Sequence, residues 1–275
     1  MIRRPQIMGI VNITPDSFSG DGLINPGDAL AHAEHLLKDG ADCLDIGAYS
    51  SRPGAPFVSE EAELSRLLPA LTMIRHALPC PLFVDTTRPG IAKHALDLGT
   101  NGINIIEGLS VSQTFWDVLA AYPQSSVILM HNPLPARPDA VTLPHGSKAH
   151  PPHVYPGGVV HHVKEDLKKV ISRSPLDPKR IMIDPGLGFG KSTKDNLLLI
   201  REALALATLG HPVVLGASRK SFLGEIVKKD TNHRVFSGLA AMIYAAPHVQ
   251  IIRTHDVSAL SDALTMGEAL KDLPQ

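Results

Sequence analysis

The stretch Ile181-Met182-Ile183-Asp184-Pro185-Gly186-Leu187-Gly188-Phe189-Gly190-Lys191 places the tightest constraint on the fold. Its continuous apolar start is typical of a parallel strand that is buried on both faces. An acid just past the C-terminal end of such a strand lies at the rim where these folds keep their chemistry. Taken alone, the stretch would also suit an ordinary strand-to-helix turn capped by Asp184, because glycine and proline mark turns everywhere. Its recurrence along the chain favours the first interpretation.

Short apolar runs alternate with helical patterns throughout the sequence. Helices are expected, for example, from Pro89 to Leu98 and from Thr193 to Ala207, where Leu197, Ile200 and Leu204 would share one face. The runs predicted as strands are Gln6 to Val11, Cys43 to Ile46, Pro81 to Val84, Gly102 to Ile106, Val127 to Met130, the run at Ile181, Val213 to Leu215 and Val249 to Ile252. Alternation of this kind indicates a parallel sheet with right-handed crossovers. We therefore predict an α/β fold of the (β/α)8 TIM barrel type.

The competing architecture is an open, doubly wound sheet. Such folds often carry a dinucleotide-binding glycine fingerprint after the first strand, whereas this chain has Asn12-Ile13-Thr14-Pro15-Asp16-Ser17-Phe18-Ser19 there. A barrel also fits 275 residues as one unit. We expect a single domain over residues 1–275, interrupted by an irregular segment at 132–158.

That segment is rich in proline and contains His145, His150 and His153. It is long for a connection between a strand and a helix, which suits a lid or an insertion. Its histidines raise the question of a metal site, but their spacing matches no compact ligand motif. The sequence therefore favours a loop over a dedicated metal centre.

Charge and cysteine content exclude several functional classes. With 26 Lys and Arg against 27 Asp and Glu, the chain has no overall basic character that would predict nucleic acid or an anionic membrane as a partner. Cys43 and Cys80 lack metal-ligand spacing and are interpreted as reduced, buried thiols. The apolar run Ile7 to Val11 is too short for a signal peptide or a membrane span. We expect a cytoplasmic protein that works on small molecules.

Polar side chains follow nearly every predicted strand, and a barrel brings them to one mouth. Asp85, Asn104 and Asp184 offer mainly acceptors, which suit a flat heterocycle with several N–H donors, such as a pterin or a purine. The next two loops carry cations, where barrels frequently hold phosphate: Arg219, Lys220, Arg253 and His255. Asn12 offers a neutral oxygen that would help to ligate magnesium beside a diphosphate. Asp45 and His131 remain open between structural and contact roles.

Several long motifs follow one another along the chain: Met8-Gly9-Ile10-Val11-Asn12-Ile13-Thr14-Pro15-Asp16-Ser17-Phe18-Ser19, Ser50-Ser51-Arg52-Pro53-Gly54-Ala55, Asp184 to Lys191, Gly216-Ala217-Ser218-Arg219-Lys220-Ser221-Phe222-Leu223-Gly224 and Arg253-Thr254-His255-Asp256. In this order they resemble the dihydropteroate synthases, and the resemblance covers essentially the whole chain. The resemblance implies condensation of 6-hydroxymethyl-7,8-dihydropterin diphosphate with 4-aminobenzoate, which gives 7,8-dihydropteroate and pyrophosphate in folate biosynthesis. It implies a sulfonamide target, with Mg2+ as the cofactor and a homodimer as the assembly.

The resemblance also implies residue roles. Asp85, Lys220, Arg253 and His255 would be catalytic, and Asn12 would bind the metal. The pterin would contact Asp85, Asn104, Met130, Asp184, Phe189, Gly216 and Lys220. The 4-aminobenzoate pocket would be formed by Ser51, Arg52, Pro53, Phe189, Lys220 and Ser221, and Arg253 and His255 would hold the diphosphate.

The sequence departs from the family pattern at a few positions. Ile105 stands where the family commonly places an aspartate, and Tyr49 replaces the usual glutamate before the second-loop serine. Ile105 raises the possibility that Asn104 is held differently. Two other functions therefore stay open: a pterin-binding paralogue without turnover, and the domain of a methyltetrahydrofolate-dependent methyltransferase. The second would not need the motifs around Lys220 and Arg253 for a diphosphate.

Overall fold

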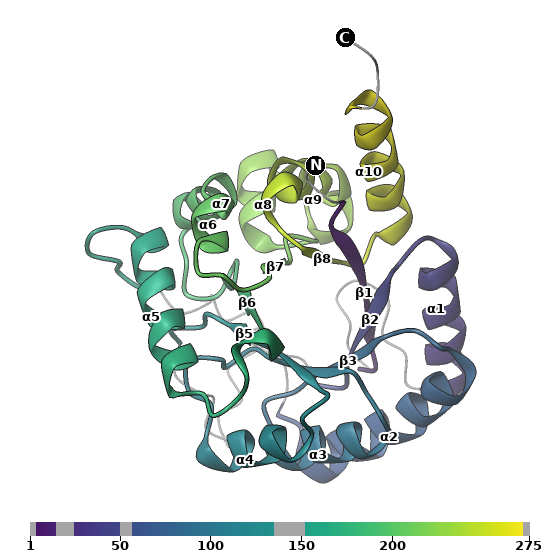
Figure 1. The fold of residues 1–275 in the computed structure, drawn as a ribbon. Coiled ribbons are helices and arrows are strands. Elements are labelled where there is room, and N and C mark those ends of the chain that lie inside the picture. The colour runs from purple at the N-terminus through teal and green to yellow at the C-terminus, as the bar shows by residue number, and fades with distance from the viewer. Residues whose placement is uncertain (1–3, 15–24, 50–56, 135–151, 272–275) are drawn as a thin grey trace.

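A computed structural model of the chain describes residues 4–14, 25–49, 57–134 and 152–271. Its core is a single eight-stranded parallel sheet in the order β6-β5-β4-β3-β2-β1-β8-β7. The parallel bridge between Ile183 and Val213 connects the two ends of this series, so the sheet closes on itself. The predicted (β/α)8 barrel is confirmed, and Figure 1 shows its strands surrounded by helices.

The strands are short and mostly buried. They are β1 Gln6–Asn12, β2 Cys43–Gly47, β3 Leu82–Asp85, β4 Gly102–Ile105, β5 Ser126–Met130, β6 Ile181–Asp184, β7 Val214–Leu215 and β8 Ile251–Thr254. β8 begins and ends two residues later than the run predicted from Val249 to Ile252. Arg253 consequently lies inside the strand rather than after it, where Asp45 on β2 and Asp85 on β3 pair with its guanidinium.

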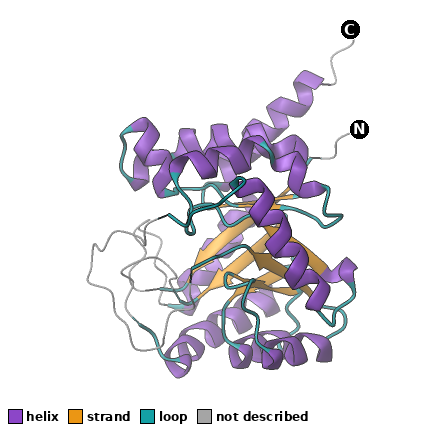
Figure 2. Cartoon of the chain, turned by 90° about the vertical axis from the view of Figure 1, so that its left-hand side faces the viewer, coloured by secondary structure: helices purple, strands orange, loops and turns teal. Residues whose placement is uncertain are grey.

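Helices cover the outside of the barrel (Figure 2). They are α1 Pro26–Lys38, α2 Glu60–Ala77, α3 Pro89–Asp97, α4 Gln113–Ala121, α5 Val159–Arg173, α6 Thr193–Arg201, α7 Ala203–Ala207, α8 Ser221–Val227, α9 Val235–Ala245 and α10 Val257–Lys271, with short 3-10 helices at Pro178–Arg180, Thr231–His233 and Ala246–His248. Side-chain caps fix several starts. Asn25 accepts a hydrogen bond from the Gly27 amide, and Ser192 with Asp195 forms a reciprocal capping box.

The helix predicted from Thr193 to Ala207 is wrong as one continuous element. It breaks at Glu202, whose φ of -100° and ψ of 25° leave the helical region. Leu199 and Ile200 are buried before the break and Leu206 after it, so the change in direction lets both segments bury a face. Of the three residues expected on one face, Leu197 and Ile200 line the same groove, whereas Leu204 lies beyond the break and is 58% exposed.

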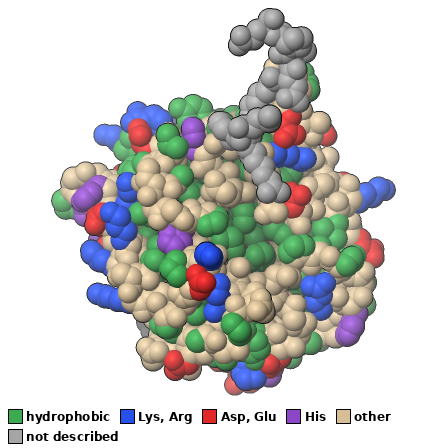
Figure 3. Space-filling view, in the orientation of Figure 1, with side chains coloured by type: hydrophobic (Ala, Val, Ile, Leu, Met, Phe, Trp, Pro, Cys, Tyr) green, Lys and Arg blue, Asp and Glu red, His purple; other side chains and the backbone are tan. Residues whose placement is uncertain are grey.

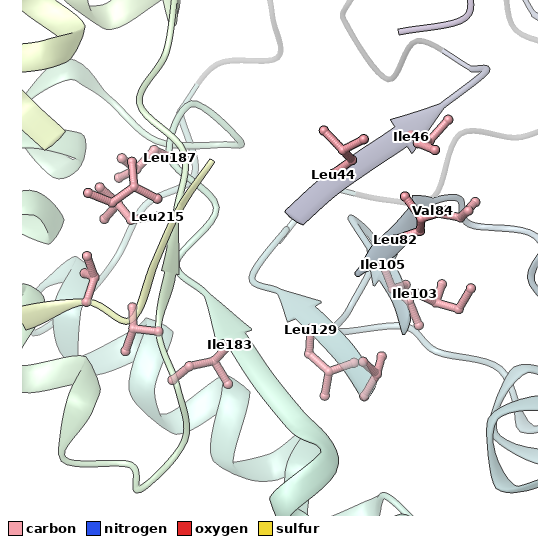
Figure 4. Close-up of a cluster of buried hydrophobic side chains, with 14 of the residues drawn as sticks. Leu44, Ile46, Leu82, Val84, Ile103, Ile105, Leu129, Ile183, Leu187 and Leu215 are labelled. Carbon is pink, nitrogen blue, oxygen red and sulfur yellow. The ribbon is translucent and has the colours of Figure 1, made fainter. Parts of the chain in front are cut away.

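Two apolar layers hold the barrel together. The larger layer lies between strands and helices and includes the outward side chains Leu44, Val84, Ile103 and Ile183 (Figure 4). The smaller layer fills the barrel interior and consists of Met8, Cys43, Phe83, Ile128, Met182, Val214 and Ile251. On the face drawn in Figure 3, acidic and basic side chains are interspersed around the edge of the described molecule. No helix among the described residues is long and apolar enough to cross a membrane.

Candidate active site

The candidate site is a layer of side chains inside the barrel, next to the smaller apolar layer and closer to the C-terminal ends of the strands. Because side chains alternate along a strand, the residue two positions after an inward core residue also points inward. Six residues of the smaller apolar layer are each followed, two positions later, by a residue that this rule places inward. The inward residues are Asp45, Asp85, Met130, Asp184, Gly216 and Arg253. Asn104 occupies the same level on β4, where it pairs with Asp85 in the strand register. The strands therefore collect most of the predicted site residues at one end of the barrel.

Arg253 is held between two carboxylates. Its Nε donates a short hydrogen bond to Oδ2 of Asp45, and one Nη lies 3.2 Å from Oδ2 of Asp85. Asp45 is fully buried, whereas the Asp85 side chain is 20% exposed at the mouth. Burial and the nearby charge of Asp45 raise the pKa of Asp85 to about 7, although Arg253 opposes the shift. Asp85 can thus change its charge near neutral pH.

Asp45 also orients Asn104. The side-chain amide of Asn104 donates to Oδ2 of Asp45 at 3.0 Å, which leaves the Asn104 carbonyl oxygen as the acceptor available to a ligand. Asp45 is the internal network acid that the sequence left as one of two options, and it fixes Arg253 and Asn104 together. Ile105 lies in the outer apolar layer, so the residue that replaces the family aspartate makes no polar contact with Asn104.

Asp184 ends β6 and is only 8% exposed. The amide of Gly186 donates to its Oδ1 at 2.6 Å, which fixes the carboxylate against the following turn. Burial raises the pKa of Asp184, while the Gly186 amide and the nearby Lys220 oppose that rise. The turn requires glycine, because Gly186 has a φ of +67° and a Cβ there would lie 2.0 Å from the carbonyl oxygen of His131.

Lys220 and Phe189 form the next part of the mouth. The Lys220 ammonium lies 4.7 Å from the centroid of the Phe189 ring, a cation–π distance that brings the loops after β6 and β7 together. Ser221 follows Lys220 as the first residue of α8. Met130, at the end of β5, is 5% exposed and pairs with Asp184 in the strand register.

A polar group at the ends of β1, β7 and β8 includes Asn12. His255 Nδ1 lies 3.1 Å from the Ser218 hydroxyl, and its Nε2 lies 3.5 Å from the Asn12 amide nitrogen. Arg219 pairs with Asp256 at 2.7 Å. Its backbone is left-handed, with a φ of 58°. Arg219 and Arg253 thus each pair with a carboxylate of the chain itself.

The described side chains at this mouth suit magnesium only if most of the ion's ligands come from a bound molecule and from water. Within the described residues, no group of three or more His, Cys, Asp or Glu side chains could hold a metal ion. Asn12 lies at the mouth with its amide nitrogen 3.5 Å from His255, and the same side chain carries one amide oxygen. Magnesium is usually held by few protein oxygens together with phosphate and water, so this sparse set suits an ion that arrives with a diphosphate.

Most predicted site residues come together as expected. Ser51, Arg52 and Pro53 lie outside the described residues, as do the larger part of the 132–158 segment and the histidines His145 and His150. Sequence reasoning missed Ser218 as the partner of His255 and gave no role to Lys191. Both follow strands in glycine-containing motifs, but nothing in their spacing reveals which atoms they contact.

Similarity to known proteins agrees with this geometry. The sequence matches the pterin binding enzyme family over residues 8–255. It is 39% identical to the dihydropteroate synthase of Neisseria meningitidis serogroup C, with 97% of this chain and 93% of that protein covered. It is 34% identical to the Bacillus subtilis dihydropteroate synthase, with 96% and 88% covered.

Solved structures give the same result. The Xanthomonas albilineans dihydropteroate synthase with 4-aminobenzoic acid has a TM-score of 0.86 and 38% identity, with 99% of this chain and 95% of that chain covered. The same enzyme in complex with 7,8-dihydropteroate has a TM-score of 0.82 and 35% identity, with 100% and 96% covered. Sequence, fold and site thus lead to one assignment: the chain belongs to the pterin binding enzyme family, and within it to the dihydropteroate synthases.

Proposed function

We propose that the protein condenses 6-hydroxymethyl-7,8-dihydropterin diphosphate with 4-aminobenzoate, releasing pyrophosphate and forming 7,8-dihydropteroate for folate biosynthesis. The observation that carries this proposal is one layer of side chains that joins buried acceptors to cations at a single mouth. Relatives named dihydropteroate synthase match nearly the full length of the chain. The protein is accordingly a transferase that moves a pterinylmethyl group.

The hydrogen-bond acceptors of the site match the N–H groups of the pterin ring. The Asp184 carboxylate and the Asn104 carbonyl oxygen would accept hydrogen bonds from the amino and N–H groups of the pterin. Met130 and Gly216 would provide flat, apolar walls, and Lys220 with Phe189 would close the pocket on one side. Asp85 stands between ring and cations, where a carboxylate stabilises positive charge that develops on the reacting methylene.

The cationic side chains of the site match the negative charge of the diphosphate leaving group. Arg253 and His255 would hold the diphosphate while the bond from the pterin methylene to oxygen breaks. Asn12 would hold Mg2+ together with the diphosphate oxygens, and the ion when bound neutralises charge on the departing pyrophosphate. A diphosphate here would compete with Asp45 and Asp85 for the Arg253 guanidinium. The amine of 4-aminobenzoate needs no prior deprotonation, because it attacks an electron-poor carbon with its lone pair. The new C–N bond replaces the broken C–O bond, and the proton that the nitrogen then releases passes to pyrophosphate or water.

The 4-aminobenzoate pocket is proposed at Ser221, Lys220 and Phe189, with Ser51, Arg52 and Pro53 as further contacts. The Xanthomonas albilineans relative was solved with 4-aminobenzoic acid and with 7,8-dihydropteroate. The Yersinia pestis relative was solved with a sulfonamide drug. A sulfonamide should therefore compete with 4-aminobenzoate for this protein.

One assay tests the function and its two alternatives. The purified protein is incubated with pterin diphosphate and 4-aminobenzoate while pyrophosphate and dihydropteroate are followed, with Mg2+ present and after its removal by EDTA. We expect equal amounts of both products and a loss of turnover of at least tenfold without the ion. Pterin binding without either product would identify a non-catalytic paralogue. Methyl transfer from methyltetrahydrofolate to a corrinoid would identify the methyltransferase domain.

We further propose that residues 1–275 form one domain, that the protein works in the cytoplasm and that it is a homodimer. The pairing of β1 with β8 supports a single unit, and free Cys43 and Cys80 suit a reducing compartment. Helix α9 supports a dimer, because it contains no charged residue and yet exposes Phe236 by 80% and Tyr244 by 60%. A helix that is apolar on all sides usually has neighbours on all sides.

A groove with a volume of about 500 Å³ lies beside Tyr244. Apolar side chains from three helices contribute to its walls, including Leu197 on α6 and Ile226 on α8. Monomers rarely leave a contiguous apolar surface of this kind exposed. A second copy of the same helices is the occupant that closed, self-complementary symmetry provides.

A further inference from the structure

Lys191 is a buried lysine whose ammonium group binds backbone rather than a carboxylate. The residue is only 7% exposed. Its Nζ donates to the carbonyl oxygens of Gly186 and Phe189, each at 2.9 Å, and of His131 at 3.2 Å. The same nitrogen lies 3.1 Å from Nδ1 of His131. One side chain thus satisfies acceptors on two separate segments.

The neighbouring histidine is adapted to this arrangement. Burial and the proximity of Lys191 lower the pKa of His131 to about 3, so its ring is neutral and Nδ1 can accept a hydrogen bond. Its Nε2 lies 3.6 Å from Asp166 on α5. Burial also lowers the pKa of Lys191, to about 7. An ammonium group in such surroundings is costly unless acceptors compensate it, and here four lie within hydrogen-bond distance.

Two of the three bound carbonyls, those of Gly186 and Phe189, belong to the loop after β6, which carries two groups assigned to the pterin pocket. The Gly186 amide fixes Asp184 through the 2.6 Å hydrogen bond, and Phe189 presents its ring to Lys220. Without the lysine, the carbonyl oxygens of Phe189 and His131 would lose this donor, whereas the Gly186 carbonyl would keep its hydrogen bond from the Phe189 amide at 3.1 Å. The link that Lys191 makes between the loop after β6 and the end of β5 would be lost.

We propose that Lys191 is a positioning residue for the pterin pocket. It fixes the loop after β6 to the end of β5 and thereby holds Asp184 and Phe189 in the positions from which they would contact the pterin ring. This inference rests on the proposed function. It concerns only the ring end of the site. At the diphosphate end, Asn12 closes β1 and His255 follows β8, whereas the hydrogen bonds of Lys191 go to the end of β5 and to the loop after β6.

The two ends of the site allow a test that separates positioning from general destabilisation. Calorimetric titration uses 6-hydroxymethylpterin as the ring probe and pyrophosphate with Mg2+ as the anion probe, well below the melting temperature. For Lys191→Met we expect ring affinity to fall at least tenfold and pyrophosphate affinity to stay within twofold of the wild type. The KM for the pterin substrate should rise by a similar factor, while kcat changes less than threefold.

Lys194→Met is the matched control, because Lys194 lies three residues away on α6 and is exposed. It should change neither affinity. Tyr155→Phe is a milder second variant in case Lys191→Met fails to fold. It removes one hydrogen bond of 3.0 Å to the Gly190 carbonyl, which still accepts from the His153 amide at 2.9 Å. We expect a two- to fivefold loss of ring affinity alone.

Unchanged ring affinity in Lys191→Met, or equal losses for both probes, would overturn the inference. If Lys191→Met does not fold, unchanged ring affinity in Tyr155→Phe would have the same consequence. A wild-type protein that binds no pterin would instead overturn the proposed function. The two failures are therefore distinguishable.

Discussion

At the scale of single residues, the site depends on how Asp85 is charged. Its carboxyl group lies beside buried Asp45 and beside Arg253, and its pKa is raised to about 7. The neutral acid predominates below that pH and cannot stabilise a positive methylene. The carboxylate predominates above it. We therefore expect kcat/KM for the pterin substrate to rise as the pH increases from 6 to 8, since this ratio reports the ionisation of the free enzyme.

Asp85→Asn removes this titration. We expect kcat to fall about 100-fold, as is typical when a group that stabilises transition-state charge is lost, with a smaller rise in KM. The rise of kcat/KM with pH should disappear, as steady-state assays at several pH values would reveal. Equal losses in kcat and in pterin affinity would contradict the proposed electrostatic role.

The residues of the site were predictable to different degrees. The ends of parallel strands meet at one mouth, so apolar runs followed by polar residues were enough to bring Asp85, Asn104 and Asp184 together. Partners across the barrel were not predictable. Asp45 contacts Arg253 from 208 positions away in the sequence, and Lys191 binds a carbonyl 60 positions away. Such contacts depend on the barrel register, which apolar patterning does not specify.

At the scale of elements, the strand boundaries were predicted to within about two residues. The break between α6 and α7 and the contacts between helices were not predicted. Helix α6 and helix α7 separate at Glu202, although the apolar pattern continues across it. The ends of α2 and α3 are joined by Arg88, which donates to Glu63 at 2.6 Å. Its guanidinium also lies 5.3 Å from the centroid of the Tyr49 ring, so the tyrosine that departs from the family pattern has a cation as its neighbour.

The Arg88–Glu63 pair provides a stability prediction. Glu63 is 1% exposed, and burial already raises the pKa of its carboxyl group despite the arginine. Arg88→Met leaves this buried acid without its cation, although the Thr86 hydroxyl still donates a hydrogen bond to it at 3.0 Å. We expect the free energy of unfolding to fall by about 3 kcal/mol, the usual cost of removing one partner of a buried pair.

Urea denaturation measures this change. Combining Arg88→Met with Glu63→Gln should restore part of the lost free energy of unfolding, because no buried charge is then left unpaired. Lys93→Met is the control, since Lys93 and Asp97 form an exposed pair on α3 and should matter little. A double variant as unstable as the sum of both single changes would argue against an energetic coupling between these residues.

At the scale of the whole molecule, closure of the barrel explains why the chain can keep polar groups in its interior. The apolar layer from Met8 to Ile251 seals one end, and the outer layer between strands and helices supplies most of the buried apolar surface. The mouth is thus free to hold Asp45, Asp85, Asp184 and Arg253, which partly compensate one another. On the outer surface, α6, α8 and α9 together expose several large apolar side chains, among them Leu197, Ile226 and Phe236.

This apolar surface leads to the last prediction, which concerns assembly. If a second copy covers α9, its aromatic side chains lie in the centre of a two-fold interface, where truncating a single aromatic residue commonly costs about 2 kcal/mol or more. Phe236→Glu and Tyr244→Glu should therefore weaken the dimer at least 30-fold each, since every substitution occurs in both protomers. Sedimentation over a range of protein concentrations measures the change. Met73→Glu on α2 adds the same charge at a side chain that is 41% exposed, so its dimer should stay as tight as that of the wild type. A wild-type protein that sediments as a monomer at micromolar concentration would show that these helices face solvent, and the exposed aromatic residues would then need another explanation.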